Sequence, residues 1–297
     1  MTITGKHRDI KPKKRRKKRE YLLWRYLVAF IAILFALAPL VWIILSALNP
    51  TGGLATVSIS KDMLGLNNFR ELFNNPDYPY LRWYRNSLMV SSIAAVFQVL
   101  IGTMSAYAFS RIMFKGRRLS LGGLLLLQMF PQLLSLVAIF LFMSKVSDIV
   151  PALGIGTFAG LTLVYLGGAM GYNTYLIKGF FDTIPRELDE AATVDGASAN
   201  QIFFKIILPL AAPILAVVAL LAFIGLMNDF VLASIFLTRT EDTTLAVGLH
   251  GLVSGKYEDN WGIFAAGALL AAIPVVILFQ LLQRFIVEGL AAGSVKG

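Results

Sequence analysis

The residues whose types and spacing could support chemistry lie between positions 190 and 209. The pattern E-A-A-x3-G-x9-I-x-L-P is formed by Glu190, Ala191, Ala192, Gly196, Ile206, Leu208 and Pro209, with Asp195 beside the glycine. This segment separates two long apolar runs and is too polar to lie in lipid. Its chemistry is non-covalent, because a carboxylate can make a charge-assisted hydrogen bond and small residues let another surface approach closely.

Covalent and metal chemistry have little support in the sequence. The chain has no cysteine and only two histidines, His7 and His250, which are far apart. The stretch nearest to a phosphate-binding loop, 251–257, lacks the first glycine because position 250 is histidine, and has Tyr257 in place of the magnesium ligand. We therefore expect a non-enzymatic chain that holds no metal or cofactor and does not hydrolyse ATP itself.

Local signals predict two short helices around the pattern. Pro185 suits a first helical turn, with Asp182 and Thr183 available as caps before it. Ile184, Leu188, Ala191 and Ala192 then fall on one face at helical spacing. Gly196 ends this helix in a left-handed conformation.

The second short helix begins with a capping box. Ser198 and Gln201 form that box, and the helix carries Ile202, Phe203, Ile206 and Ile207. We expect Pro209 to push Leu208 out of helical geometry and so to close the unit.

The spacing of this pattern resembles the EAA loop of permease subunits in binding-protein-dependent ABC importers. The resemblance implies a type I ABC importer permease fold, in which this loop is a cytosolic helix–turn–helix that docks on the ATPase. We call residues 178–209 the EAA segment. The resemblance assigns the coupling to the ATPase to eight residues of this chain: Glu190, Ala191, Ala192, Asp195, Gly196, Ile206, Leu208 and Pro209.

The same resemblance implies a set of partners. They are two ABC ATPase subunits that bind ATP and Mg²⁺, a second permease subunit, and an extracytoplasmic sugar-binding protein that delivers a carbohydrate. The chain itself would lie in a bacterial plasma membrane.

Composition independently requires a membrane protein. Hydrophobic residues make up 57% of the chain, charged residues only 15%, and the mean hydropathy is +0.71. A helical span needs roughly 20 mostly apolar residues. Six such runs are found, at 24–48, 87–109, 119–143, 158–177, 212–237 and 263–286. The predicted fold class is therefore an all-α integral membrane protein with six transmembrane helices.

Positive charge sets the expected orientation. Most of the 27 lysines and arginines fall in segments on the N-terminal side, including Arg111, Lys115, Arg117 and Arg118. Both termini and the EAA segment should therefore be cytosolic. The basic run at 11–19 precedes the first span, where anionic lipid attracts it, so we expect no nucleic-acid binding and a disordered tail.

These expectations divide the chain into five parts. Residues 1–20 form a basic cytosolic tail, 21–48 the first transmembrane helix, and 49–85 an extracellular segment with a short helix near 64–73. Residues 86–288 form a five-helix permease core that contains the EAA segment, and 289–297 form a cytosolic C-terminal tail.

Further short motifs narrow the resemblance to carbohydrate importers. They are A-Y-A-F-S-R at 106–111, Q-M-F-P at 128–131, Y-L-G-G at 165–168, T-L-A-V-G-L at 244–249 and A-G-S-V-K-G at 292–297. Together they are similar to maltose/maltodextrin permeases, which implies that substrate class.

Polar residues inside the spans are candidates for the translocation pathway. Asp229 is the one acidic residue deep in an expected span, and Asn228 precedes it. An aspartate at mid-span must face protein or a water-filled cavity, and an Asn–acid pair at this place is common in the resembled sugar permeases. A buried acid that fixes helix packing is the alternative.

Gln128 and Gln132 are further pathway candidates. They and Gln98 can equally make interhelical hydrogen bonds. Gly167 and Gly171 form a GxxxG pair, which suggests either a helix-packing face or nothing special.

Two other functions stay open at this point. A secondary transporter driven by an ion gradient would need no ATPase and would usually show internal repeats, which the sequence lacks. A membrane-anchored nucleic-acid or scaffold protein would depend on the basic tail and not on the later spans.

Overall fold

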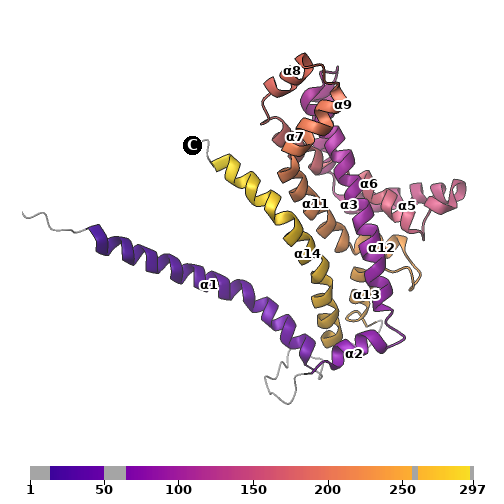
Figure 1. Ribbon diagram of the computed structural model, residues 1–297. Coiled ribbons are helices and arrows are strands. Elements are labelled where there is room, and N and C mark those ends of the chain that lie inside the picture. The colour runs from indigo at the N-terminus through magenta and orange to yellow at the C-terminus, as the bar shows by residue number, and fades with distance from the viewer. Residues whose placement is uncertain (1–13, 50–64, 256–259, 295–297) are drawn as a thin grey trace, which may run out of the picture.

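The computed structural model of the chain describes residues 14–49, 65–255 and 260–294, and every regular element within them is helical (Figure 1). In chain order the α-helices are α1 (Lys14–Leu48), α2 (Asn67–Asn74), α3 (Tyr80–Arg111), α4 (Arg117–Met129), α5 (Gln132–Ile149), α6 (Phe158–Gly167), α7 (Tyr172–Phe181), α8 (Glu187–Val194), α9 (Ala199–Ile202), α10 (Leu208–Leu210), α11 (Ala212–Met227), α12 (Val231–Phe236), α13 (Leu245–Gly251) and α14 (Trp261–Ser294). A 3₁₀ turn, η2 (Pro151–Leu153), follows α5, and a π-helical turn, η3 (Phe203–Ile207), joins α9 to α10.

The helix α3 forms the axis of the body. It packs against α6, α7, α11 and α13, and α11 packs in turn against α14. Figure 1 shows α8 and α9 at one end of this axis and α2 and α13 at the other. Residues near the two ends of α3 therefore serve opposite ends of the molecule.

Three helices are each long and apolar enough to cross a membrane: residues Trp24–Leu48 of α1, the whole of α3, and residues Trp261–Val287 of α14. Two bent pairs would bring the number to five in the described part of the chain. They are Arg117–Met129 with Leu133–Ile149, bent by 103°, and Ala199–Leu210 with Ala212–Met227, bent by 75°. The all-α membrane fold is thus confirmed, whereas the expected continuity of the six spans is wrong at three places.

Each of the three breaks has a local cause. The 119–143 run breaks before Pro131, because proline forces Phe130 into an extended conformation. The 158–177 run breaks between Gly167 and Gly171, where glycines weaken the helix. The 212–237 run breaks at 228–230. There the Asp229 carboxylate accepts a hydrogen bond from the backbone N–H of Ala233, which competes with the hydrogen bonds of a continuous helix.

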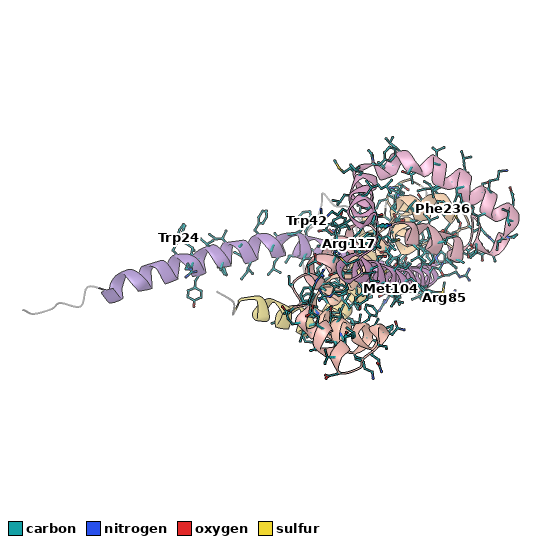
Figure 2. The ribbon with its side chains drawn as sticks, turned by 90° about the horizontal axis from the view of Figure 1, so that it is seen from above. Trp24, Trp42, Arg85, Met104, Arg117 and Phe236 are labelled. Atoms are coloured by element: carbon teal, nitrogen blue, oxygen red, sulfur yellow. The ribbon has the colours of Figure 1, made fainter. Side chains whose placement is uncertain are left out.

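The basic segment is not disordered throughout. The backbone of α1 is helical from Lys14, whereas residues 1–13 lie outside the described part. Lysine and arginine are good helix formers, so they can extend a helix that the apolar run already forms. The N-terminal part of α1 extends away from the body, whereas its C-terminal end packs against α14 and α2 (Figures 1 and 2). Its tryptophans Trp24 and Trp42 are 64% and 46% exposed.

The short helix expected near 64–73 is α2, and it is part of the core. Its Leu72 is fully buried, and the buried side-chain amide of Asn68 donates to the carbonyl oxygens of Ala47 (2.9 Å) and Asn49 (2.8 Å). These carbonyls lie at and just after the C-terminal end of α1, so Asn68 provides hydrogen bonds to this helix end.

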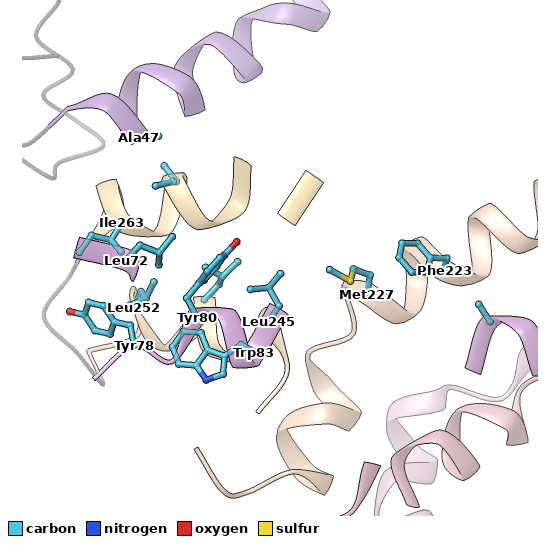
Figure 3. Close-up of a cluster of buried hydrophobic side chains, with 14 of the residues drawn as sticks. Ala47, Leu72, Tyr78, Tyr80, Trp83, Phe223, Met227, Leu245, Leu252 and Ile263 are labelled. Carbon is cyan, nitrogen blue, oxygen red and sulfur yellow. The ribbon is translucent and has the colours of Figure 1, made fainter. Parts of the chain in front are cut away.

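Buried apolar side chains form three clusters along α3. The cluster next to α2 contains Tyr80, Trp83 and Leu245 (Figure 3). A middle cluster joins α3 to α5, α6 and α12, and a third joins α3 to α7, the EAA segment and α11. In the first cluster, a Cβ on Gly248 would lie 2.3 Å from the Trp83 ring, so only glycine fits there.

Candidate functional site

The turn of the EAA segment has the geometry that its sequence predicts. Gly196 has φ +83°, in the left-handed region, and its N–H donates to the carbonyl of Thr193 (3.0 Å). The N–H of Ala197 donates to the carbonyl of Ala192 (2.9 Å), which completes a Schellman motif at the end of α8. The prediction that Gly196 ends this helix in a left-handed conformation is confirmed.

The predicted capping box is also present at the start of α9. The Gln201 N–H donates to Ser198 Oγ (3.4 Å), and the Ser198 N–H donates to Gln201 Oε1 (2.8 Å). The caps expected from Asp182 and Thr183 are not formed. The hydroxyl of Thr183 donates back to the carbonyl of Phe180, and Asp182 bonds α3 instead.

The end of the EAA segment differs from the prediction. Leu208 stays helical (φ −62°, ψ −45°), and its N–H donates to the carbonyl of Phe203 across the π-helical turn η3. That turn changes the hydrogen-bond register just before Pro209, which has no N–H to give. The chain changes direction only at Ala211, where the 75° bend leads into α11.

The predicted coupling residues divide into two groups. Glu190, Ala191, Asp195, Gly196 and Pro209 are exposed. Ala192 is buried, Ile206 and Leu208 are half-buried, and of the predicted apolar face of α8 only Ile184 and Ala192 are covered, since Leu188 is 42% exposed. The small size of Ala192 therefore serves packing inside the chain, whereas Ala191 faces outward.

The end of α3 holds the EAA segment in place. Arg111 Nε lies 2.8 Å from Asp189 Oδ2, with the side chains only 7% and 20% exposed, and Arg111 Nη2 donates to the carbonyl of Ile184 (2.9 Å). Arg186 Nη2 donates to the carbonyl of Ser110 (3.1 Å). Two arginines thus connect α8 and the residues before it to the last turn of α3.

A second connection passes through Asp182. Ser110 Oγ donates to Asp182 Oδ1 (2.7 Å), and Lys178 forms an ion pair with the same carboxylate. Burial raises the pKa of Asp182, but hydrogen bonds from Lys178 and Ser110 and the charges of Lys178 and Arg117 outweigh it, so this pKa lies below its usual range. Asp182 is therefore ionised when it holds α7 to α3.

The polar residues of the membrane region form a second site. Tyr165 Oη donates to Asp229 Oδ2 (2.8 Å), and the Ala233 N–H donates to the same oxygen (2.9 Å). Gln98 Nε2 donates to the carbonyl of Tyr165 (2.9 Å), which confirms an interhelical hydrogen bond for Gln98. A chain of hydrogen bonds thus runs from α3 through α6 to the start of α12.

The predicted pathway residues do not meet in one place. Asn228 is exposed and lines a groove of about 740 Å³, together with Phe230, His250 and Trp261. Gln128 is also exposed, but it lines a different groove of about 850 Å³. The side chain of Gln132 lies outside the described part.

The predicted glycine pair does not form a shared packing face. Gly167 ends α6, and no atom lies within 4 Å of where its Cβ would be. Gly171 precedes α7, and a Cβ there would overlap the side-chain amide of Gln128. The second glycine therefore makes room for Gln128.

Several residues at these sites were missed by sequence reasoning. In the sequence Arg111 counts as a cytosolic charge and as the end of the motif at 106–111, and Asp189 falls outside the predicted apolar face of its helix, so nothing pairs the two. Tyr165 was noted within a motif, but nothing in the sequence pairs it with Asp229. His250 has its ring centroid 4.5 Å from that of Phe230, at the edge of the same groove.

No group of three or more metal-binding side chains is found in the described ranges. In the stretch 251–257, Lys256 and Tyr257 fall in a gap of the structure, and the residues before them only extend the end of α13.

Known proteins resemble this chain over most of its length. The model of the family described as binding-protein-dependent transport system inner membrane component matches residues 98–291. The galactooligosaccharides transport system permease protein GanQ of Bacillus subtilis (strain 168) is 43% identical over 285 residues, which covers 95% of this chain and 98% of that protein. The maltose/maltodextrin transport system permease protein MalG of Escherichia coli (strain K12) is 40% identical over 292 residues, covering 96% and 98%.

A solved structure shows the same fold. The crystal structure of a bacterial ABC transporter involved in the import of the acidic polysaccharide alginate contains a chain with a TM-score of 0.71 and 23% identity, covering 92% of this chain and 99% of that chain.

Proposed function

The chain belongs to the family of binding-protein-dependent transport system inner membrane components, and from this premise we propose that it is the permease subunit of an ATP-powered importer for a hexose oligosaccharide. It would form half of the path across the membrane. As a permease subunit it is a non-catalytic membrane component, so the ATP and Mg²⁺ that power transport would be bound by partner ATPases.

The observation that carries this proposal is the construction of the EAA segment. Its exposed residues, Glu190, Ala191, Asp195 and Gly196, lie at one end of the molecule on a short helix and a tight turn. Behind them, Arg111 joins the same helix to α3 through a largely buried ion pair. A partner that moves this surface would therefore move α3, which runs to the opposite end of the body.

The proposed assembly has two ATPase subunits, a second permease and an extracytoplasmic sugar-binding protein. The positive charges at 111–118 favour an arrangement in which the EAA segment and both termini are cytosolic. The apolar face of α1, including Phe35 at 83% exposure, requires cover by lipid or by the second permease. The proposed assembly does not include a nucleic acid.

Asn228 and Asp229 are proposed pathway residues. The groove that Asn228 lines combines aromatic side chains with two polar ones, Asn228 and His250, a composition typical of small-molecule sites. Asp229 follows Asn228 in the chain and is half-buried. Gln128 belongs to the other groove and would contribute only if both grooves open into one path. Gln132, whose side chain lies outside the described part, stays a proposed pathway residue on the sequence alone.

The identity of the transported sugar is the most specific part of the proposal. One relative is named for galactooligosaccharides and another for maltose/maltodextrin. Oligosaccharides of hexoses are what these names share, and the maltodextrin expectation from the short motifs remains one of two specific candidates.

Reconstitution into vesicles with the proposed partners tests the function. Labelled maltodextrin and galactooligosaccharide would be offered separately, with ATP inside or with an ion gradient alone. We expect uptake of one of them that requires both ATP and the binding protein. Uptake driven by the gradient alone would support a secondary transporter instead, and uptake of neither sugar with all partners present would contradict the substrate class.

A further inference from the structure

A cavity of about 830 Å³ lies where the chain leaves α3 and enters α4. Its lining combines two chemistries: the cations Lys115, Arg117, Arg118 and Lys178, and large apolar side chains such as Met113 and Leu119. Only Lys178 of this lining belongs to the EAA segment, and none of the lining residues belongs to the two grooves described above. A ligand that fits it must offer both negative charge and apolar surface.

The cations that line this cavity outnumber the carboxylates that form ion pairs with them. Lys178 is neutralised by its ion pair with Asp182. Arg117 donates to the carbonyl of Ser110 (3.4 Å), which is uncharged. Among the ion pairs of the described residues none includes Lys115, Arg117 or Arg118. In the described residues Lys115 and Arg118 therefore face the cavity without a carboxylate partner, and Arg117, whose charge also stabilises the Asp182 carboxylate, adds a third positive charge.

The backbone supports an anion at the same place. Gly116 precedes α4 with φ +86°, and no atom lies within 4 Å of where its Cβ would be. There is therefore open space beside the start of this 13-residue helix, although the N–H of its first residue, Arg117, donates to the carbonyl of Phe114 (3.3 Å). Free N–H groups and the helix dipole at such a terminus favour negative charge.

The apolar side chains are exposed beside these charges. Met113 and Leu119 are each 82% exposed and Phe114 is 40% exposed. Exposed apolar side chains of this size are unfavourable in water, but they gain from contact with hydrocarbon. An inorganic anion would satisfy the cations and leave this apolar surface uncovered.

The location agrees with the depth of lipid headgroups. The cavity lies at the connection between α3, which is long enough to span a membrane, and the bent pair α4–α5. A short connection between two membrane helices reaches the surface of the bilayer, where basic pockets between helices bind anionic headgroups. We propose that this cavity binds the phosphate headgroup of an anionic phospholipid, with the acyl chains lying along Met113 and Leu119.

Native mass spectrometry of the purified full-length chain tests this proposal. The protein would be taken from membranes of phosphatidylcholine with and without phosphatidylglycerol, and the phosphatidylglycerol retained would be counted. For the double variant Lys115→Gln/Arg118→Gln we expect the retained phosphatidylglycerol to fall about tenfold, since each cation near the surface contributes to binding anionic lipid.

A matched control removes two exposed cations from the other end of the molecule. Arg70→Gln/Arg85→Gln should retain the lipid as the wild type does. A charge-conserving variant, Lys115→Arg/Arg118→Lys, should also retain it, which separates loss of charge from misfolding. Equal retention by wild type, control and Lys115→Gln/Arg118→Gln would overturn the site.

Inorganic phosphate distinguishes a lipid from a free anion. It should not displace the lipid, because it offers no acyl chains, and Leu119→Ser should weaken retention of phosphatidylglycerol without creating sensitivity to phosphate. If phosphate alone empties the cavity, or binds there as well as the lipid does, the proposal of a lipid site is wrong.

Discussion

Arg111, the last residue of α3, lies with its Nε 2.8 Å from Oδ2 of Asp189 in α8. The pair is largely buried, and it joins α3, which forms the axis of the body, to the helix that carries Glu190, Ala191 and Ala192. A displacement of α8 by a partner must therefore either move the end of α3 or break this ion pair.

Asp189→Asn should weaken the hold of α3 on the EAA segment. Removing one partner of a buried ion pair leaves the other charge uncompensated and costs about 3–5 kcal/mol. Because Asp189 is 20% exposed, we expect the lower end of that range. Transport-coupled ATPase activity of the assembled complex should fall, while membrane insertion is kept.

The control for this prediction is the exposed pair Lys145–Asp148, whose side chains are 82% and 68% exposed. Lys145→Gln should change the thermal stability of the purified chain very little, because such surface pairs contribute about 0–1 kcal/mol. If Asp189→Asn lowers the transport-coupled ATPase activity no more than Lys145→Gln does, the Arg111–Asp189 pair does not transmit movement.

Gly196→Val should uncouple transport without unfolding the membrane helices. The obstacle is the backbone and not crowding, since no atom lies within 4 Å of the place of a Cβ, whereas φ is +83°. A left-handed conformation costs a residue with a side chain about 1–2 kcal/mol, and more when it is β-branched. Sugar-stimulated ATPase activity and uptake measure the effect.

Asparagine and a second glycine provide the comparison. Gly196→Asn should be tolerated better than valine, because asparagine visits the left-handed region more readily. Gly179→Ala, inside α7 with open space around it and no positive φ, should leave coupling unchanged. Normal uptake by Gly196→Val would remove the docking role from this turn.

Glu190→Ala should weaken co-purification of the ATPase subunit. Glu190 is exposed and takes part in none of the ion pairs found in the described residues, so a charge-assisted contact must come from a partner chain. Such contacts contribute about 1.5–3 kcal/mol. Glu187→Ala, at an exposed position one turn earlier, is the control, and equal yields of complex from both variants would make Glu190 a plain helix former.

Asp229→Cys tests whether the polar site reaches the translocation path. In this naturally cysteine-free chain, the new thiol should react with a small water-soluble reagent at a rate that changes when the ATPases bind ATP. Asn228→Cys should react faster, since Asn228 is exposed and Asp229 is half-buried. Ser91→Cys, at a position only 1% exposed in α3, should not react.

A thiol at 229 that stays unreactive in both nucleotide states would assign Asp229 to helix packing. Its bonds from Tyr165 and from the Ala233 N–H would then be its whole role.

Local sequence signals predicted the features whose causes are local. The left-handed turn at Gly196 and the capping box of Ser198 with Gln201 depend on residues within a few positions, and both are present. The breaks at Pro131 and Gly168 also have local causes, but a hydropathy window averages over them because the flanking residues stay apolar. The window therefore shows one span where the backbone has two helices.

Contacts between distant residues could not be predicted in the same way. Tyr165 and Asp229 are 64 positions apart, and only the packing of α6 against α12 brings them together. Helical periodicity places Asp189 only outside the apolar face of its helix and says nothing about Arg111, which lies at the end of α3. The partner of a charged residue at a helix end thus depends on which other helix the fold places beside it.

The most direct test of the account is a crosslink from the EAA segment to the ATPase. Val194 of α8 is 87% exposed, and Leu66, at the opposite end of the body, is 59% exposed. In the assembled complex, Val194→Cys should crosslink to the ATPase through a short bifunctional thiol reagent, and Leu66→Cys should not. A crosslink from Leu66→Cys, or none from Val194→Cys in a complex that still transports, would contradict the proposed coupling role.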